Sequence, residues 1–194
     1  MPSFDCPDQK RQVKRGNHLD SATQQLINQA DTLFVATTYT TDEDRPSLGA
    51  DASHRGGKPG FVHVEDDRTF ILPDFSGNLF YNTVGNILLT AKAGFLFIDF
   101  ETNDLVYLTG RAEVISEGER LKAFVGAERL IRFHTEEWLR VADSLPLRFR
   151  FGEYSPSLQR TGSWEQVEET LAATQEQNVY APTSKSDVGL SGDS

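Results

Sequence analysis

The segment "LVYLTGRAEVI", residues 105–115, alternates between two kinds of side chain, and this alternation restricts the fold more than any other feature. Its even-numbered positions are small or apolar, whereas its odd-numbered positions include Tyr107, Arg111 and Glu113. Successive side chains of a β-strand point to opposite faces, so a period of two predicts a strand with one buried face. Such a strand is typical of the wall of a β-barrel or a β-sandwich.

The other segments extend this prediction to an antiparallel barrel. Strands are expected at "TLFVATTYT", "SLGADAS" and "AGFLFIDF", and a hairpin is expected from "FVHVE" and "RTFILP". We interpret residues 129–141 as a further strand, because β-branched and aromatic residues alternate there. Helices are predicted over residues 19–30, from about residue 78 to 91, and after a capping box formed by Ser116 and Glu119. The predicted fold class is therefore α+β, mainly β: a small antiparallel β-barrel with peripheral helices.

Length and charge limit the classes of function. The chain has 194 residues, a formal net charge of −10 and one cysteine, Cys6. An acidic surface repels nucleic acid, and no apolar run is long enough for a membrane span. The N-terminal residues contain no apolar stretch typical of a secretory signal, so a cytoplasmic location is the default expectation. We expect a leader (residues 1–18), a folded domain (19–170) and a disordered tail (171–194), and we interpret the basic residues 10–15 as part of a solvated leader.

Against this acidic background, "SHRGGKPGF" (residues 53–61) combines cations with three glycines. Arg55 carries a planar fork of donors suited to a phosphate, and Lys58 carries a point charge. Glycines leave backbone N–H groups unshielded, as in anion-binding nests. Taken alone, the segment favours an ordinary surface loop that carries two cations over an anion site.

A second candidate follows in "LPDFSGNLFYN", residues 72–82, where a strand runs through a turn into a helix expected to begin near Asn78. A helix start holds unpaired N–H groups and favours an anion, although Ser76 and Asn78 are also ordinary capping residues. Asn78, Asn82 and Asn86 recur every four residues and would line one side of this helix. They could contact a ligand, contact another subunit or face water; Phe80, Val84, Ile87, Leu88 and Ala91 would form the apolar side.

Other chemistry-bearing residues give weaker signals. The four histidines show no spacing typical of metal ligands, so no metal site is predicted. Asp99 and Glu101 follow a strand and are interpreted as turn residues rather than as an acid/base pair. Trp164 is expected to anchor the C-terminal segment, with a role over an aromatic ligand as the alternative.

The order "FVATT", "ASHRGGKPGFVHV", "TFILPDFSGNLFYNTVGNIL", "AGFLFIDF", "LTGRAEV" resembles the pyridoxamine 5′-phosphate oxidase-related FMN-binding family, over roughly residues 20–165. The blocks "SHRGGKPGF" and "PDFSGN…TVGN" are similar to an uncharacterised branch of that family. The resemblance implies a split β-barrel and a homodimer with FMN at the subunit interface. The members that oxidise pyridoxamine phosphate carry R-x-V-L-L-K and G-S-R-K blocks, which this chain lacks, so the resemblance implies the cofactor more strongly than that substrate.

The resemblance also implies a set of FMN-binding residues. Arg55 and Lys58, with Ser53 and His54, would hold the phosphate, and the strand end Leu72–Phe75 would run beside the flavin ring. Ser76, Asn78 and Asn82 at the helix start would complete the phosphate and ribityl site. The full predicted set is Ser53, His54, Arg55, Lys58, Leu72, Pro73, Asp74, Phe75, Ser76, Asn78 and Asn82. No catalytic residue is assigned, and the expected activity is an FMN-dependent oxidoreductase on a small molecule, with a non-catalytic flavin carrier or sensor and a haem-binding protein as alternatives.

Overall fold

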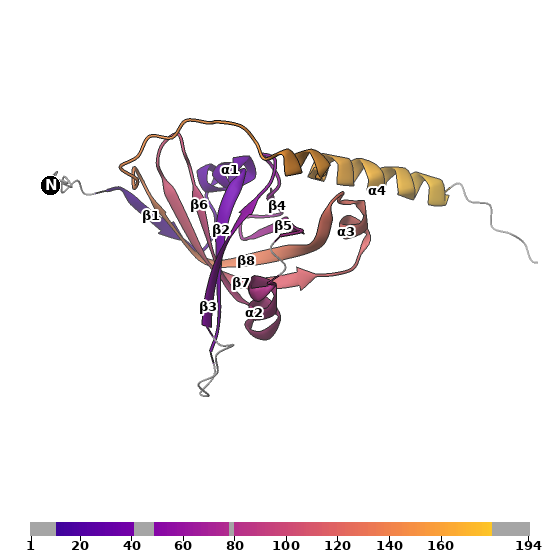
Figure 1. Ribbon diagram of the computed structural model, residues 1–194, viewed down its shortest axis with the longest axis horizontal. Coiled ribbons are helices and arrows are strands. Elements are labelled where there is room, and N and C mark those ends of the chain that lie inside the picture. Colours follow the sequence, from indigo (N-terminus) through magenta and orange to yellow (C-terminus); the bar gives the residue numbers. More distant parts are fainter. Residues whose placement is uncertain (1–10, 41–48, 78–79, 180–194) are drawn as a thin grey trace, which may run out of the picture.

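A computed structural model gives the fold over residues 11–40, 49–77 and 80–179 (Figure 1). One antiparallel sheet runs in the order β3-β2-β6-β7-β8-β5-β4, with β1 paired to β8. Its strands are β1 (Val13–Gly16), β2 (Thr32–Tyr39), β3 (Gly49–Gly56), β4 (His63–Val64), β5 (Thr69–Phe75), β6 (Lys92–Ile98), β7 (Leu105–Ile115) and β8 (Ala127–Val141). The predicted fold class is confirmed: α+β and mainly β, an antiparallel split β-barrel with peripheral helices.

Strand β8 organises the sheet because it pairs along both of its edges. One edge pairs with β7 along Leu105–Ile115, while the other pairs first with β5 and then with β1. The alternation in β7 has the predicted result, since its even-numbered side chains from Val106 to Ala112 are buried and its odd-numbered ones from Tyr107 to Glu113 are exposed. The interpretation of residues 129–141 as a strand is confirmed.

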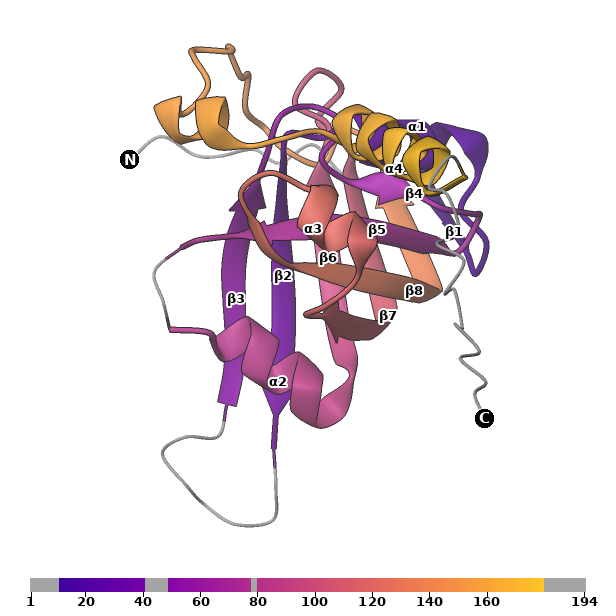
Figure 2. The same cartoon turned by 90° about the vertical axis from the view of Figure 1, so that its right-hand side faces the viewer.

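Within the part of the chain that the structure describes, four helices flank the sheet: α1 (Ser21–Gln29), α2 (Asn82–Thr90), α3 (Glu119–Ala123) and α4 (Trp164–Val179). A 3-10 helix, η1 (Pro156–Arg160), precedes α4. Helix α1 starts where predicted, because the Asp20 carboxylate accepts a hydrogen bond from the Thr23 N–H at 2.8 Å. Helices α1 and α2 lie at opposite ends of the sheet in both views (Figures 1 and 2). Among the described residues, no helix is both long enough and apolar enough to cross a membrane.

Two helix starts differ from the predictions. Helix α2 begins at Asn82 rather than near residue 78, because Tyr81 adopts a left-handed conformation (φ 54°), which a right-handed helix cannot include. The predicted apolar side is correspondingly wrong in part, since Val84 and Ile87 are buried but Leu88 is exposed. The predicted capping box is also wrong, because α3 is preceded by Gly118 and receives no side-chain cap.

Phenylalanine rings form the centre of the main core. Phe70 meets Phe95 at a ring-centroid distance of 5.1 Å and Phe133 at 5.0 Å, and all three side chains are buried. Edge and tilted contacts of this kind add to the hydrophobic stabilisation of the buried rings. The core lies inside the curved sheet and leaves the ends of β3 and β5 free to carry polar side chains.

A second, smaller core joins α3 and α4 to β5 and β8. Trp164 is 6% exposed, donates its indole N–H to the Phe61 carbonyl at 2.7 Å, and packs against Phe124. These contacts match the anchoring role expected for Trp164. Asp99 likewise stabilises a turn, as expected, because its carboxylate accepts hydrogen bonds from the N–H groups of Glu101 and Thr102.

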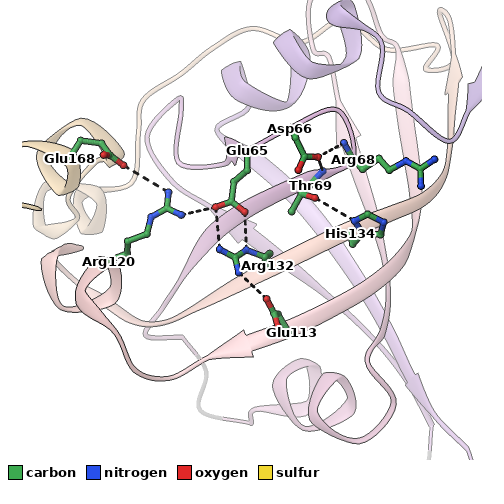
Figure 3. A network of polar contacts seen from close by, with 9 residues as sticks. All are labelled: Glu65, Asp66, Arg68, Thr69, Glu113, Arg120, Arg132, His134 and Glu168. Atoms are coloured by element: carbon green, nitrogen blue, oxygen red, sulfur yellow. Dashed lines mark hydrogen bonds and ion pairs between the residues drawn. The ribbon is translucent and has the colours of Figure 1, made fainter.

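An ion-pair network ties the β4–β5 hairpin to the same region (Figure 3). Glu65 binds Arg120 at 2.6 Å and Arg132 at 2.8 Å, and Arg132 reaches Glu113 at 3.2 Å. Burial acts to raise the pKa of Glu65, but hydrogen bonds from Arg132 and Arg120 outweigh it and hold the pKa below its ordinary value.

Parts of the predicted leader and tail have regular structure. Residues 13–16 form β1, and residues 171–179 continue α4. Cys6 and Lys10 lie outside the described residues, as does the chain beyond residue 179. The division into leader, domain and tail stays a prediction.

Candidate functional site

A cavity of about 490 Å³ lies between β3, the end of β5 and the start of α2. We call it the α2 cavity; it is lined by residues 51–56, 73–77 and 80–84. Three segments distant in sequence therefore meet here, because β3 and β5 end at the same side of the sheet and α2 packs across β2 and β3. Its size is in the range typical of cavities that hold small organic ligands.

Arg55 is the central cation of the α2 cavity. Its Nε donates to Asp74 at 3.0 Å, and its Nη1 donates to the Ser53 hydroxyl at 3.0 Å and to the His54 carbonyl at 3.1 Å. The side chain is 22% exposed, so it is partly desolvated but still accessible from the cavity. This arrangement fixes the orientation of the guanidinium on the strand that carries it.

Asp74 lies beneath Arg55 on β5 and has a second arginine beside it. Arg129 of β8 approaches its carboxylate at 3.6 Å, since the register of the two strands places Asp74 opposite Arg129. Burial raises the pKa of Asp74 above its ordinary value, and this effect exceeds the opposing attraction of Arg55 and Arg129. Two arginines thus flank one buried carboxyl group, and Arg129 also forms an ion pair with its neighbour Glu128.

A chain of hydroxyl groups continues from Arg55 to α2. The Ser53 and Thr83 hydroxyls are 2.8 Å apart, and the Thr83 hydroxyl donates to Asp51 at 2.7 Å. Asp51, Ser53 and Arg55 are alternate residues of one strand, so all three side chains face the helix. The chain of contacts fixes the first turn of α2 against β3.

The first turn of α2 contributes Asn82, Thr83 and Val84 to the lining of the α2 cavity. Tyr81, the residue before the helix, makes no side-chain capping hydrogen bond, so its side chain does not pair the first N–H groups of α2. Its ring instead lies 4.9 Å from the Arg129 guanidinium carbon. Asn82 lines the cavity, whereas Asn86 donates to the Thr37 hydroxyl at 3.1 Å and supports the helix from below.

Eight of the eleven predicted site residues line the α2 cavity: Ser53, His54, Arg55, Pro73, Asp74, Phe75, Ser76 and Asn82. Lys58 does not, because it lies beyond the end of β3 and donates its ammonium to the Thr161 carbonyl at 2.8 Å. Leu72 is fully buried in the main core, and Asn78 lies outside the described residues. The FMN-binding role of the whole set stays a prediction.

One glycine of "SHRGGKPGF", Gly57, has its N–H group paired within the protein. The Gly57 N–H donates to the Asp31 carbonyl at 3.0 Å and is not available to a ligand. A Cβ at Gly57 would lie 2.3 Å from the Phe61 ring, so this glycine permits Phe61 to pack closely. The two cations of the segment lie in different places: Arg55 lines the α2 cavity, whereas Lys58 lies on the connection that follows β3.

Sequence reasoning missed Asp51, Thr83 and Arg129. Asp51 could have been predicted, because the period of two that places Ser53 and Arg55 on one face also includes Asp51. Thr83 required the correct start of α2. Arg129 required the register between β5 and β8, for which the sequence carries no local signal.

The fold and the cavity define a small split-barrel protein with a polar, cation-bearing cavity beside its sheet. A family model described as pyridoxamine 5′-phosphate oxidase matches residues 19–150, and the chain belongs to that family. No curated protein matches the sequence.

Solved structures of similar proteins are distant. HupZ of Group A Streptococcus is 20% identical, with 61% of this chain and 90% of that chain covered and a TM-score of 0.46. An FMN-binding protein of Syntrophomonas wolfei is 16% identical, with 64% and 85% covered and a TM-score of 0.43. At such scores the similarity does not extend to function, and family membership rests on the match over residues 19–150.

Proposed function

We propose that the chain is an FMN-binding flavoprotein, a homodimer that acts as an FMN-dependent oxidoreductase on a small molecule. The observation that carries this proposal is the α2 cavity, in which Arg55 and the first turn of α2 line one space of about 490 Å³. A dianionic phosphate is favoured both by a guanidinium and by helix N–H groups. Family membership supports the same ligand.

The residues present fit the cofactor. Arg55, Ser53 and the first turn of α2 would hold the phosphate, and the apolar side chains of Pro73 and Phe75 would face the flavin ring. Of the two carboxyl groups in the cavity, Asp74 pairs with two arginines, so its charge opposes a phosphate less than that of a free carboxylate would. Asp51 accepts a hydrogen bond from the neutral Thr83 hydroxyl and keeps its charge.

Bound FMN would supply a ring that accepts and donates electrons, and the protein residues would bind and orient it. Pro73 and Phe75 would exclude water from one side of the ring, while Arg55 would fix the distal phosphate. His54 lies at the edge of the cavity with its Nε2 hydrogen-bonded to the Thr32 hydroxyl. This contact holds the imidazole ring in one orientation.

A homodimer would cover apolar surface next to the cavity. Leu88 and Leu89 on α2 are 68% and 64% exposed, although α2 contributes Val84 and Ile87 to the interior. Two neighbouring exposed leucines on a short helix are typical of an interaction surface. The cavity at the start of the same helix would then lie near the interface.

Titration of purified protein with FMN tests the proposal directly. We expect quenching of flavin fluorescence with saturable, one-to-one binding, and an absorption spectrum with flavin bands. Absence of binding would overturn the proposal, and a Soret band would favour the haem-binding alternative. Reduction of the bound flavin by NADH or NADPH, followed by transfer to an acceptor, would distinguish the oxidoreductase from a carrier.

A further inference from the structure

The chain between β8 and α4, residues 142–163, borders a second cavity. We call this segment the strap; it runs over one end of the barrel in Figure 1 as the orange trace that leads to α4. The strap cavity has a volume of about 710 Å³ and is lined by residues of β3 and β5 on one side and of the strap on the other. Lys58 fixes the strap by donating to the Thr161 carbonyl at 2.8 Å.

The strap cavity adjoins the α2 cavity. His54, Gly56, Phe75 and Ser76 line both of them, so these residues form a common wall. A molecule in the strap cavity would therefore lie next to a molecule in the α2 cavity. Two adjoining cavities with a shared wall suit two ligands that must approach each other.

The open side of the strap cavity is aromatic. The rings of Phe151 and Tyr154 are in contact at a centroid distance of 4.7 Å, and the two residues are 65% and 46% exposed. Exposed aromatic pairs are unfavourable in water unless a ligand or partner covers them. Both residues belong to the strap, whereas the Phe75 ring packs against Phe124 in the smaller core.

The charged residues of the strap cavity are two carboxylates and one cation. Asp31 and Glu153 contribute negative charge, and Arg160 contributes one positive charge. Hydroxyl groups of Thr32, Ser155 and Ser157 add neutral hydrogen-bond donors. Aromatic rings and hydroxyl donors suit an uncharged planar ring with carbonyl acceptors, and the excess of carboxylates disfavours an anionic ligand. A polyanion fits poorly, particularly in a chain with a net charge of −10.

We propose that the strap cavity binds the second reactant of the flavoprotein, an uncharged planar ring compound of the quinone class. The ring lies against Tyr154 and Phe151, and its carbonyl oxygens accept hydrogen bonds from the hydroxyl groups of the cavity. As a reactant site the proposal rests on the proposed flavin function, but ligand binding to the strap cavity is measurable without any flavin.

Calorimetric titration with tetramethyl-1,4-benzoquinone provides the test. This probe is uncharged and fully substituted, so it does not add to the thiol of Cys6. We expect it to bind flavin-free and FMN-loaded protein equally, because the two cavities hold separate ligands. Tyr154→Ala should weaken quinone binding about tenfold through loss of one aromatic contact. Tyr107→Ala is the matched control, since Tyr107 is 41% exposed on β7 and lines neither cavity.

The outcomes separate this inference from the proposed function. Equal quinone affinity of Tyr154→Ala and the parent protein would overturn the inference, as would competition between quinone and FMN. Binding of NADH that depends on Arg160, without binding of quinone, would assign the cavity to a dinucleotide and also overturn it. Failure of FMN to bind, with Tyr154-dependent quinone binding intact, would overturn the proposed function and leave the assigned ligand class standing.

Discussion

Arg55 shows how one strand position is prepared for a ligand. Its Nε and Nη1 are held by Asp74, Ser53 and the His54 carbonyl, so the guanidinium keeps one orientation before any ligand arrives. An oriented donor loses less side-chain entropy on binding than a free one. The buried pair with Asp74 is thus better understood as positioning Arg55 than as a contribution to stability.

Arg55→Ala should weaken FMN binding by about 1.5–3 kcal/mol, the contribution of a hydrogen bond to a charged group. Fluorescence titration at constant ionic strength measures the FMN affinity of each variant. Lys58→Ala is the control, because Lys58 is bound to the Thr161 carbonyl and should leave FMN affinity unchanged. A loss with Lys58→Ala and none with Arg55→Ala would place the phosphate elsewhere.

For single residues of the site, the sequence predicts positions where the period of two of a β-strand applies. The strand pattern places Ser53 and Arg55 together on the face that meets α2, and it equally implies Asp51. Lys58 lies past the end of that strand, where the period no longer determines direction. Arg129 reaches the site only through the register of β5 and β8, which depends on pairing between residues far apart in the chain.

Among the elements, β7 carries a constraint that its hydrophobic pattern does not reveal. Gly110 fits the buried face as a small residue, but the β7–β8 register also shifts between Thr109 and Gly110. At this bulge a Cβ on Gly110 would lie 2.1 Å from the His134 carbonyl oxygen. The two strands approach one another here more closely than any side chain permits.

Gly110→Ala should therefore destabilise the protein by more than about 2 kcal/mol, because backbone must move to admit the methyl group. Chemical denaturation monitored by circular dichroism gives the free energy of unfolding. Gly85→Ala in α2 provides the contrast, since its added Cβ would meet nothing within 4 Å. That change should stabilise the protein by about 0.5–1 kcal/mol through helix propensity. A Gly110→Ala protein of parental stability would contradict the bulge as described.

The start of α2 shows why element boundaries are harder to predict than element types. The sequence "NLFYNTVGNILL" correctly predicts a helix, but Ser76 and Asn78 resemble caps and draw the predicted start towards residue 78. The left-handed Tyr81, whose ring lies near Arg129, begins the helix at Asn82 instead. Tertiary contact thus overrides a local capping signal.

The ion pairs of Glu65 join β4 to α3 and β8 and make stability depend on pH (Figure 3). Arg132 and Arg120 hold the pKa of Glu65 below its ordinary value of 4.5 against the opposing effect of burial. A lowered carboxyl pKa stabilises the folded state above the ordinary value, and that contribution is lost as the pH falls through the folded-state pKa.

Glu65→Gln should accordingly lower the free energy of unfolding by about 1–3 kcal/mol at pH 7, since two arginines lose their charged partner. The difference from the parent protein should shrink as the pH falls below 4.5, where the carboxylate becomes protonated. Chemical denaturation of both proteins at pH 7 and at a pH below 4.5 measures this difference in the free energy of unfolding. Glu119→Gln, which alters only an exposed pair with Lys122, should change stability by less than about 0.5 kcal/mol. A pH-independent effect of Glu65→Gln would contradict the assigned ion pairs.

On the surface of the whole molecule, helix α2 leaves large apolar side chains exposed. Helix α2 buries Thr83, Val84 and Ile87 against the sheet but presents Leu88 and Leu89 to solvent. The sequence pattern places Leu88 on the apolar side of the helix, although Leu88 is exposed in the single chain. The proposed homodimer would account for this difference if a second copy of the chain covered Leu88 and Leu89.

The double change Leu88→Asp and Leu89→Asp should produce a folded monomer, because two charges would be desolvated at the interface while neither side chain supports the core. Sedimentation at micromolar concentrations measures the oligomeric state, and circular dichroism verifies the fold. FMN affinity should fall with the loss of the dimer if the cofactor lies at the interface. Val125→Asp provides the control, since Val125 is 60% exposed and lies apart from α2, between α3 and β8. A parent protein that binds FMN tightly as a monomer would refute the dimer and place the complete cofactor site within a single chain.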